Sequence, residues 1–253
     1  MSAVSVVMAV YDGQRFLRDQ VESVIGELLS GDELIVVDDA SIDGSLALLQ
    51  GIDSAALRIY RNPCNLGVIG SFERGLQLAA HEFIFLCDQD DIWLPGKRAA
   101  FVDAFERDPA VFAVISDAQV IDAQGAVVAP SFMTTRGGFD GSVVATVWRN
   151  RYLGCAMALR RPLLAAALPI PRQAPMHDMW FGAMARMTGK VVYLPKPFLQ
   201  YRRHAGNVTP SRRQSLPRMF RWRVGLVKAL CARMLACKLG LHGRPADGTT
   251  KPT

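Results

Sequence analysis

The fold is decided by two stretches of sequence that share one design, Leu34-Ile35-Val36-Val37-Asp38-Asp39 and Phe83-Ile84-Phe85-Leu86-Cys87-Asp88-Gln89-Asp90-Asp91. Short apolar runs that end on turn-forming residues are typical of buried strands in a parallel sheet. Ligands of open α/β sheets bind beyond the carboxyl ends of the strands, so we expect both acidic clusters to face one cleft. Converging carboxylates repel one another unless a cation joins them. A divalent cation that carries the phosphates of a ligand meets that need.

Strands and helices alternate along the first 90 residues. We expect strands at residues 3–10, 33–37, 57–61 and 83–87, and helices at 14–29, 45–50 and 69–80. Asp43 and Ser71 are predicted to begin the second and third helices as N-caps. This alternation with short connections predicts a right-handed, mostly parallel central sheet flanked by helices.

The pattern changes after Asp91. We expect a turn at residues 93–95, a helix at 97–105, a hairpin of 111–121 with 127–128, strands at 154–159 and 191–194, a helix from 178 to 187 and a last helix at 216–239. Residues 131–141 contain three glycines among polar neighbours. We expect this stretch to be a mobile loop beside the cleft.

Composition indicates the class of protein. With 253 residues, half of them hydrophobic, the chain can bury the core of one α/β domain. The five cysteines are odd in number and widely scattered, which favours a reduced, cytoplasmic protein. The first apolar stretch lacks a preceding basic residue, and basic residues interrupt the last one. We therefore expect neither a signal peptide nor a membrane span.

Basic residues gather at the end of the chain. Residues 1–201 carry 17 Lys and Arg against 22 Asp and Glu, whereas residues 202–253 carry 12 against 1. This asymmetry indicates an anionic partner, either a membrane leaflet or a nucleic acid. The last predicted helix carries an apolar stripe at helical spacing, made of Phe220, Val224, Val227, Cys231 and Met234. We expect this helix to lie on an anionic bilayer, with a helix packed on the body as the alternative.

Three motifs in order give the chain a resemblance to a known family. They are Val6-Val7-Met8-Ala9-Val10-Tyr11-Asp12, Val37-Asp38-Asp39-Ala40-Ser41-Ile42-Asp43-Gly44 and Cys87-Asp88-Gln89-Asp90-Asp91-Ile92-Trp93-Leu94-Pro95. Together they resemble the inverting, nucleotide-sugar-dependent glycosyltransferases of family 2, and the third has the form typical of rhamnosyltransferase-like members. The resemblance implies a GT-A fold over residues 1–210, with residues 211–253 as a basic helical tail.

The first two motifs imply where the donor nucleotide binds. By the resemblance, Ala9 and Tyr11 line the nucleotide pocket and Asp39 contacts the base. A carboxylate can accept the imide N–H of uracil or thymine, which neutral cytosine lacks, so the donor is expected to be a UDP- or dTDP-sugar. The family more often has Asn at the position of Asp12 and Gly at that of Ala40. Capping of the following helix is the alternative role for the Asp38-Asp39 pair.

The third motif implies a metal and diphosphate site. The resemblance makes Asp90 a metal ligand and Asp88 a contact to ribose or metal, and Mg²⁺ or Mn²⁺ would stabilise the leaving nucleoside diphosphate. Asp91 is expected to cap the turn before Trp93. A late motif, Tyr201-Arg202-Arg203-His204, resembles the family segment in which His completes the metal site and Arg meets phosphate. His204 is therefore a candidate ligand and Arg202 a candidate diphosphate contact.

The catalytic base is expected beyond the donor half. Met176-His177-Asp178-Met179-Trp180 resembles the family's base motif, with Asp178 in the position that deprotonates the acceptor hydroxyl. The alternative is that Asp178 caps the helix that follows. Gly154-Cys155-Ala156-Met157-Ala158 resembles the acceptor-side strand, whose small residues would let the backbone approach the donor sugar.

These expectations combine into a metal-dependent inverting glycosyltransferase of cell-surface polysaccharide assembly. The acceptor would be a saccharide or a lipid-linked intermediate, reached at the inner face of the cytoplasmic membrane. One rival is a metal-dependent phosphohydrolase, which the single acid at the end of the first strand disfavours. The other rival is a nucleic-acid-binding protein. No nucleic acid is expected as a partner, because the basic tail has few aromatic residues and the body is acidic.

Overall fold

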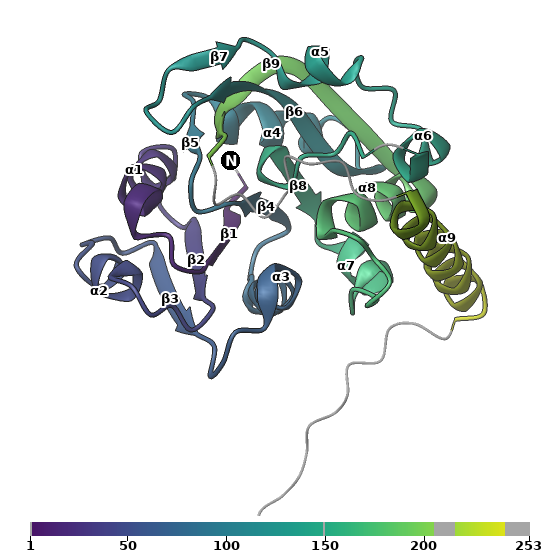
Figure 1. Cartoon of the computed structure of the whole chain (residues 1–253), viewed down its shortest axis with the longest axis horizontal. Helices are drawn as coiled ribbons and strands as arrows, with labels where there is room; N and C mark the ends of the chain where they lie inside the picture. The colour runs from purple at the N-terminus through teal and green to yellow at the C-terminus, as the bar shows by residue number, and fades with distance from the viewer. Residues whose placement is uncertain (1, 149, 205–215, 241–253) are drawn as a thin grey trace, which may run out of the picture.

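The computed structural model describes residues 2–148, 150–204 and 216–240 (Figure 1). Within these residues, nine strands form one sheet in the order β3-β2-β1-β4-β8-β6-β9-β5, with β7 paired to β6. Helices cover both faces of this sheet (Figure 1). This arrangement is the expected α/β GT-A architecture.

The first half of the sheet is parallel, as predicted. It consists of β1 (Val4–Val10), β2 (Glu33–Asp38), β3 (Leu57–Arg61) and β4 (Phe83–Cys87). The crossover helices are α1 (Gln14–Ile25), α2 (Ser45–Gln50) and α3 (Gly67–Leu78). β1, β2 and β4 are apolar along almost their whole length because both of their faces are covered.

The second half of the sheet is mixed. It contains β5 (Ile92–Trp93), β6 (Val111–Ile121), β7 (Val127–Ala129), β8 (Met157–Arg160) and β9 (Lys190–Arg202). β8 runs antiparallel to both β4 and β6, whereas β9 runs parallel to β6. The helical elements of this half are α4 (Lys97–Glu106), α5 (Phe132–Arg136), α6 (Val143–Trp148), the 3₁₀ turn η1 (Gly154–Ala156), α7 (Pro162–Ala167), α8 (His177–Thr188) and α9 (Leu216–Lys238).

Two apolar cores lie on opposite faces of the sheet. Met8 and Val36 point into one core with α1 and α4, whereas Val7 and Val37 point into the other with α3, α7 and α8. The alternation follows the two-residue period of a strand. Each parallel strand is thereby fixed in register, and the loops at the carboxyl ends are held at one edge.

Several predicted element boundaries need correction. Ser71 lies inside α3, where its hydroxyl accepts a hydrogen bond from Asn62, so it is not an N-cap. Asp43 does accept a backbone bond, from Ser45 at 2.9 Å, but the N-cap position of α2 is Gly44. The strand predicted at 154–159 opens with the 3₁₀ turn η1 before β8 begins.

The stretch 131–141 is partly helical, so its prediction as a loop without structure was wrong. The Ser131 side chain caps α5 by accepting from the Thr134 N–H at 3.0 Å. Phe132 and Met133 are buried, and the Met133 N–H donates to the Asp117 carboxylate at 3.0 Å. The Ser131 cap and the burial of Phe132 and Met133 therefore stabilise a helix in a segment that its glycines made look like a loop.

The last helix packs on the body. Leu226 and Leu230 are buried in the core that contains α7 and α8, and the Arg233 guanidinium donates to the Leu168 carbonyl at 2.8 Å. The alternative prediction, a helix packed on the body, is therefore correct for the side of α9 that carries Leu226, Leu230 and Arg233. The boundary predicted at residues 210 and 211 lies outside the described residues. Among the described residues, no helix combines the length and apolarity needed to cross a bilayer.

Candidate functional site

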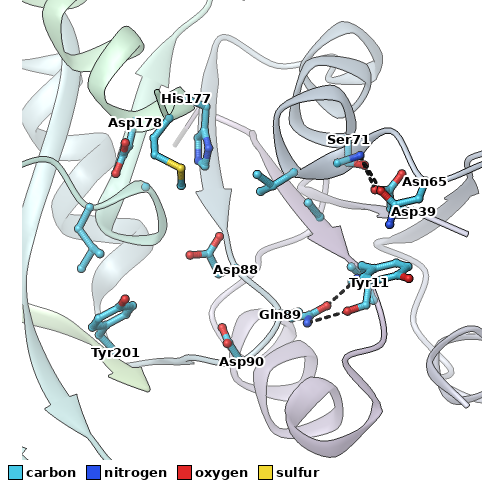
Figure 2. A pocket seen from close by; sticks show the side chains of 17 residues that line it. Tyr11, Asp39, Asn65, Ser71, Asp88, Gln89, Asp90, His177, Asp178 and Tyr201 are labelled. Carbon is cyan, nitrogen blue, oxygen red and sulfur yellow. Dashed lines mark hydrogen bonds between the residues drawn. The ribbon is translucent and has the colours of Figure 1, made fainter. Parts of the chain in front are cut away.

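A cavity of about 380 Å³ lies at the carboxyl ends of β1, β2 and β4. Figure 2 shows Asp39 and Tyr11 on one side of it, Asp178 and His177 on the opposite side, and Asp88 between them. The predicted site residues that line it are Ala9, Tyr11, Asp39, Asp88, Asp90 and Asp178. The structure thus brings together side chains that are up to 169 positions apart in the sequence.

Asp39 is held rigidly at one end of the cavity. Its carboxylate accepts from Asn62 Nδ2 at 2.6 Å and from the backbone N–H groups of Leu66 and Gly67, each at 2.8 Å. These three donors fix the orientation of the carboxylate. The carboxylate is therefore placed to accept a further N–H from a ligand.

Asp38 has a different role from its neighbour. It is fully buried, pairs with the Arg61 guanidinium at 3.2 Å and accepts the Ser41 N–H at 3.4 Å. It neither lines the cavity nor caps α2. The paired acids therefore divide into Asp38, which orders the turn, and Asp39, which lines the cavity.

Two residues of this edge adopt a left-handed backbone conformation. Asp12 has φ 46° and Ala40 has φ 61°. This region is accessible at little cost only to Gly and, to a lesser extent, to Asn and Asp. The two departures from the family pattern noted above therefore fall on positions where the backbone conformation itself favours Asn or Gly.

Gln89 links the loop after β1 to the acidic motif after β4. Its Oε1 accepts from the Tyr11 N–H at 2.7 Å and its Nε2 donates to the Tyr11 carbonyl at 3.0 Å (Figure 2). The Gln89 amide thus pairs with both the N–H and the carbonyl of Tyr11, as the backbone of a neighbouring strand would. The loop after β1 is thereby locked to the acidic motif after β4.

Asp90 and His204 meet, as predicted. The Asp90 Oδ2 lies 2.7 Å from the His204 Nε2. Burial raises the pKa of Asp88 to about 7, and the negative charges of Asp90 and Asp178 add to this effect. Neighbouring carboxylates repel one another, which raises the pKa of Asp88. A bound cation would relieve this repulsion.

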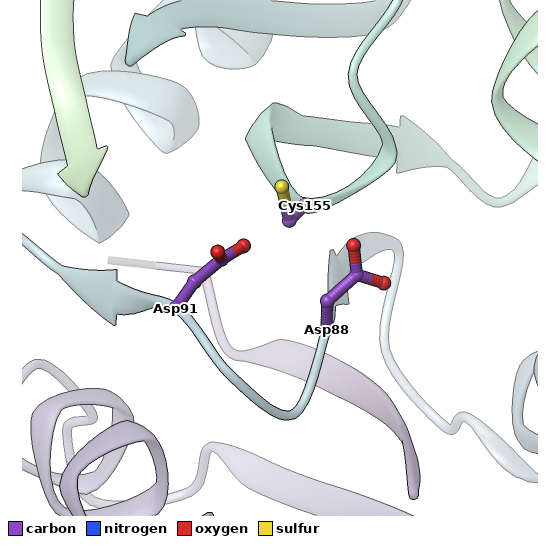
Figure 3. A group of neighbouring side chains, drawn as sticks. All are labelled: Asp88, Asp91 and Cys155. Atoms are coloured by element: carbon purple, nitrogen blue, oxygen red, sulfur yellow. The ribbon is translucent and has the colours of Figure 1, made fainter. Parts of the chain in front are cut away.

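A second acidic group lies behind this cluster. Figure 3 shows the Cys155 thiol above the carboxylates of Asp88 and Asp91, and the ligand atoms of the three residues lie within 4.8 Å of one another. Burial raises the pKa of the Cys155 thiol, which keeps it protonated and makes it a poor ligand for Mg²⁺ or Mn²⁺. Asp91 is fully buried and accepts the Arg202 N–H at 2.9 Å, instead of capping the turn before Trp93.

Two of the predicted ligands, Asp88 and Asp90, line the cavity, whereas His204 lies outside the cavity lining and contacts Asp90. Their carboxylate oxygens lie beside open space, where phosphate oxygens could complete the coordination of a hard divalent cation. Lys97 is a buried basic residue close to the second group. It is fully buried, donates to the Cys155 carbonyl at 2.6 Å and does not line the cavity.

Arg202 does not lie where a diphosphate contact was expected. Its Nε donates to the Asp90 carbonyl at 2.9 Å, and its guanidinium carbon lies 4.6 Å from the centre of the Phe16 ring. It is 4% exposed and lies outside the cavity lining. In this conformation Arg202 supports the backbone of the acidic motif from behind.

Asp178 lies on the wall of the cavity opposite Asp39. It is the second residue of α8, and both of its oxygens accept from Asn150 Nδ2 at 3.1 Å. Burial raises its pKa to about 6, while the bonds from Asn150 and from the Met179 N–H lower it. The N-cap position of α8 is Met176, so Asp178 is not the cap. A carboxylate with this pKa is ionised at neutral pH and is a competent general base.

Sequence reasoning missed several cavity residues, among them Asn65, His177 and Tyr201. It also missed Asn150, which lies 28 positions before the carboxylate that it holds. His177 and Tyr201 were quoted within motifs without a role. Asn150 follows no apolar run and carries no signal in the sequence.

The comparisons with known proteins agree with this geometry. The model of the family described as Glycosyl transferase family 2 matches residues 5–164. A glycosyltransferase of Nostoc sp. is 25% identical over 216 residues, which cover 81% of this chain and 66% of that protein. The Escherichia coli UDP-Glc:alpha-D-GlcNAc-diphosphoundecaprenol beta-1,3-glucosyltransferase WfaP is 28% identical over 113 residues, covering 44% of this chain and 45% of WfaP.

Solved structures show the same fold at lower identity. S. aureus TarS 1–349 in complex with UDP-GlcNAc superposes with a TM-score of 0.69 at 17% identity, covering 92% of this chain and 66% of that one. The mannosyltransferase PcManGT from Pyrobaculum calidifontis in complex with GDP-Man and Mn²⁺ gives 0.60 at 17% identity, covering 96% and 65%. The chain spans less than two thirds of each of these relatives. The family match covers more than half of the chain, and this protein therefore belongs to glycosyl transferase family 2.

Proposed function

We propose that the chain transfers a sugar, with inversion, from a UDP- or dTDP-sugar to an acceptor hydroxyl. The observation that carries the proposal is the placement of four carboxylates at three positions along one cavity. Asp39 lies at one end, Asp178 at the other, and Asp88 and Asp90 lie between them (Figure 2). A nucleotide sugar needs the same order of base contact, diphosphate site and attacking nucleophile.

Each group has a defined task in this scheme. Asp39 accepts the imide N–H of uracil or thymine. Asp178 takes the proton of the acceptor hydroxyl as that oxygen attacks the anomeric carbon from the face opposite the leaving group. Asp88, Asp90 and His204 would hold Mg²⁺ or Mn²⁺, which when bound supplies Lewis-acid stabilisation of the leaving diphosphate.

The acceptor is proposed to be a lipid-linked saccharide at the inner face of the cytoplasmic membrane. WfaP is named for a diphosphoundecaprenol-linked acceptor. The outer side of α9 carries exposed apolar side chains next to Arg221 and Lys228, as an anionic bilayer surface would require. A helix docked in this way would bring a membrane-bound acceptor near the wall that holds Asp178.

The substitution Asp178→Asn tests the assignment of the base. We expect transfer from the sugar nucleotide to a lipid-linked acceptor to fall at least ~10²-fold, because proton removal is lost, whereas the Kd for UDP stays within about twofold. Transfer is measured as acceptor-dependent release of UDP, and NMR of the product reports the anomeric configuration. Asp103→Asn, an exposed acid of α4, is the control and should change neither quantity. Full transfer by Asp178→Asn, or a product of retained configuration, would refute the mechanism.

A further inference from the structure

His177 is a buried polar side chain whose hydrogen bonds are missing. It opens α8, is 3% exposed and lines the cavity next to Asp178. Within the described residues, neither Nδ1 nor Nε2 has a hydrogen-bond partner. Buried polar groups of native proteins are almost always paired, and an unpaired one costs free energy. His177 therefore needs an explanation beyond stability.

The ring is fixed in place by its neighbours. It stacks on Phe72 of α3 with the ring centres 4.2 Å apart. On its other side, a Cβ added to Gly154 would lie only 2.7 Å from the His177 Nε2, so a larger residue there would displace the imidazole. The small residue at the start of η1 thus makes room for His177, in addition to lining the cavity.

The chemistry of the imidazole defines the partner that it lacks. Burial lowers the pKa of His177 to about 4, so the ring is neutral at pH 7 and offers one N–H donor and one acceptor nitrogen. A sugar hydroxyl is both a donor and an acceptor and can pair with either nitrogen. Figure 2 shows His177 beside Asp178, on the opposite side of the cavity from Asp39 and Tyr11, so the imidazole faces the part of the cavity where the sugar, and not the base, is proposed to lie.

We propose that His177 hydrogen-bonds a hydroxyl of the transferred sugar and contributes to the choice of that sugar. The proposal rests on the donor site described under the proposed function and adds a residue to it. The contact forms only when the sugar is present, because the nucleoside diphosphate alone ends at Asp88 and Asp90. Affinity for the sugar nucleotide should thus depend on His177, while affinity for the free diphosphate should not.

Two substitutions separate hydrogen bonding from packing. His177→Phe keeps a ring on Phe72 and removes both nitrogens, whereas His177→Asn retains one donor and one acceptor. The full chain is titrated with Mn²⁺ and, in turn, UDP, UDP-glucose, UDP-GlcNAc, dTDP and dTDP-rhamnose. For the sugar nucleotide that the wild type binds best, His177→Phe should weaken binding about tenfold, with the matching diphosphate within about twofold. His177→Asn should lose less, and His81→Phe, outside the cavity, should lose nothing.

A measurement on the wild type covers the case in which the variants fail to fold. The chain has four histidines, so the imidazole nitrogens can be followed one by one by NMR. The spectra are recorded with Mg²⁺, because paramagnetic Mn²⁺ would broaden nearby resonances. The His177 resonances should shift with the sugar nucleotide and stay in place with the diphosphate alone. Equal losses for both ligands, unchanged affinity in His177→Phe, or an equal shift with both ligands would overturn the inference. If the wild type bound none of the five nucleotides, the proposed function itself would fail instead.

Discussion

At the scale of single residues, the site depends on carboxylates that different neighbours hold in place. Asp39 is surrounded by N–H donors, whereas Asp178 balances burial against the amide of Asn150. The same residue type is therefore proposed to contact a base in one place and to remove a proton in another. Asn150 and Gln89 act through the groups that they position.

The pH dependence of transfer should follow the pKa of Asp178, which the hydrogen bonds from Asn150 lower. The base must be ionised, so the rate should rise with pH through about 6 in the wild type. Asn150→Ala removes hydrogen bonds that favour the carboxylate, so the pKa rises and the acidic limb should move up by about one unit. The profile is recorded with saturating Mn²⁺, which keeps the metal ligands deprotonated. A limb that stays in place in Asn150→Ala would show that another group sets it.

Ala40 is a residue where stability can be gained. Its φ of 61° costs a residue with a Cβ roughly 1 kcal/mol or more relative to Gly. Ala40→Gly is therefore expected to raise the free energy of unfolding by about 1 kcal/mol, measured by denaturant melts. Ala47→Gly, at an exposed position of α2, should lower it by a similar amount. If Ala40→Gly destabilised the protein as Ala47→Gly does, backbone strain would not explain the position.

At the scale of elements, the sequence predicted what local pattern decides. β2, β3 and β4 begin at the expected residues. β2 and β4 are short apolar runs buried along their whole length, whereas β3 is a half-exposed edge strand. β9 continues to Arg202 although the prediction ended it at Leu194. Pro195 and Pro197 argue against a strand, and the structure accommodates them with register shifts opposite β6. β5 has only two residues and exists because β9 lies beside it, which no local pattern reveals.

The two faces of α9 make different contacts. Leu226 and Leu230 are buried in the core. The side facing solvent carries Phe220, Val224, Val227 and Leu235, which are 67, 36, 42 and 59% exposed. This exposed set, the α9 stripe, follows the helical repeat. We expect such an arrangement of an interfacial helix that packs on the protein with one side and faces the bilayer with the other.

Binding to vesicles tests the α9 stripe. The chain should co-sediment with vesicles that contain phosphatidylglycerol, and binding should weaken with added salt and on neutral vesicles. Phe220→Ser combined with Val227→Ser should reduce the partition coefficient at least ~10-fold, since apolar area leaves the interface. The control is Val127→Ser with Val128→Ser, which removes exposed valines from β7. Equal binding of both double variants would show that the α9 stripe is not the contact.

At the scale of the whole molecule, the cavity exists because two different half-sheets meet. The parallel half supplies Asp39 and Asp88 from the ends of β2 and β4. The mixed half supplies Asp178 and closes the cavity opposite them. The acidic strand ends were predictable from the sequence, since parallel strands end at one edge. The position of α8 was not, because it depends on packing between elements far apart in the chain.

The central claim is that this cavity binds a uridine or thymidine diphosphate through a divalent cation, and thermal unfolding with added nucleotide tests it most directly. At about 100 times Kd, UDP or dTDP with Mn²⁺ should add ~2.7 kcal/mol, a rise in Tm of roughly 5–10 °C. Omission of Mn²⁺, or the substitution Asp90→Ala, should remove most of that rise, and GDP should give little. No rise with UDP or dTDP, or an equal rise with GDP, would contradict the account.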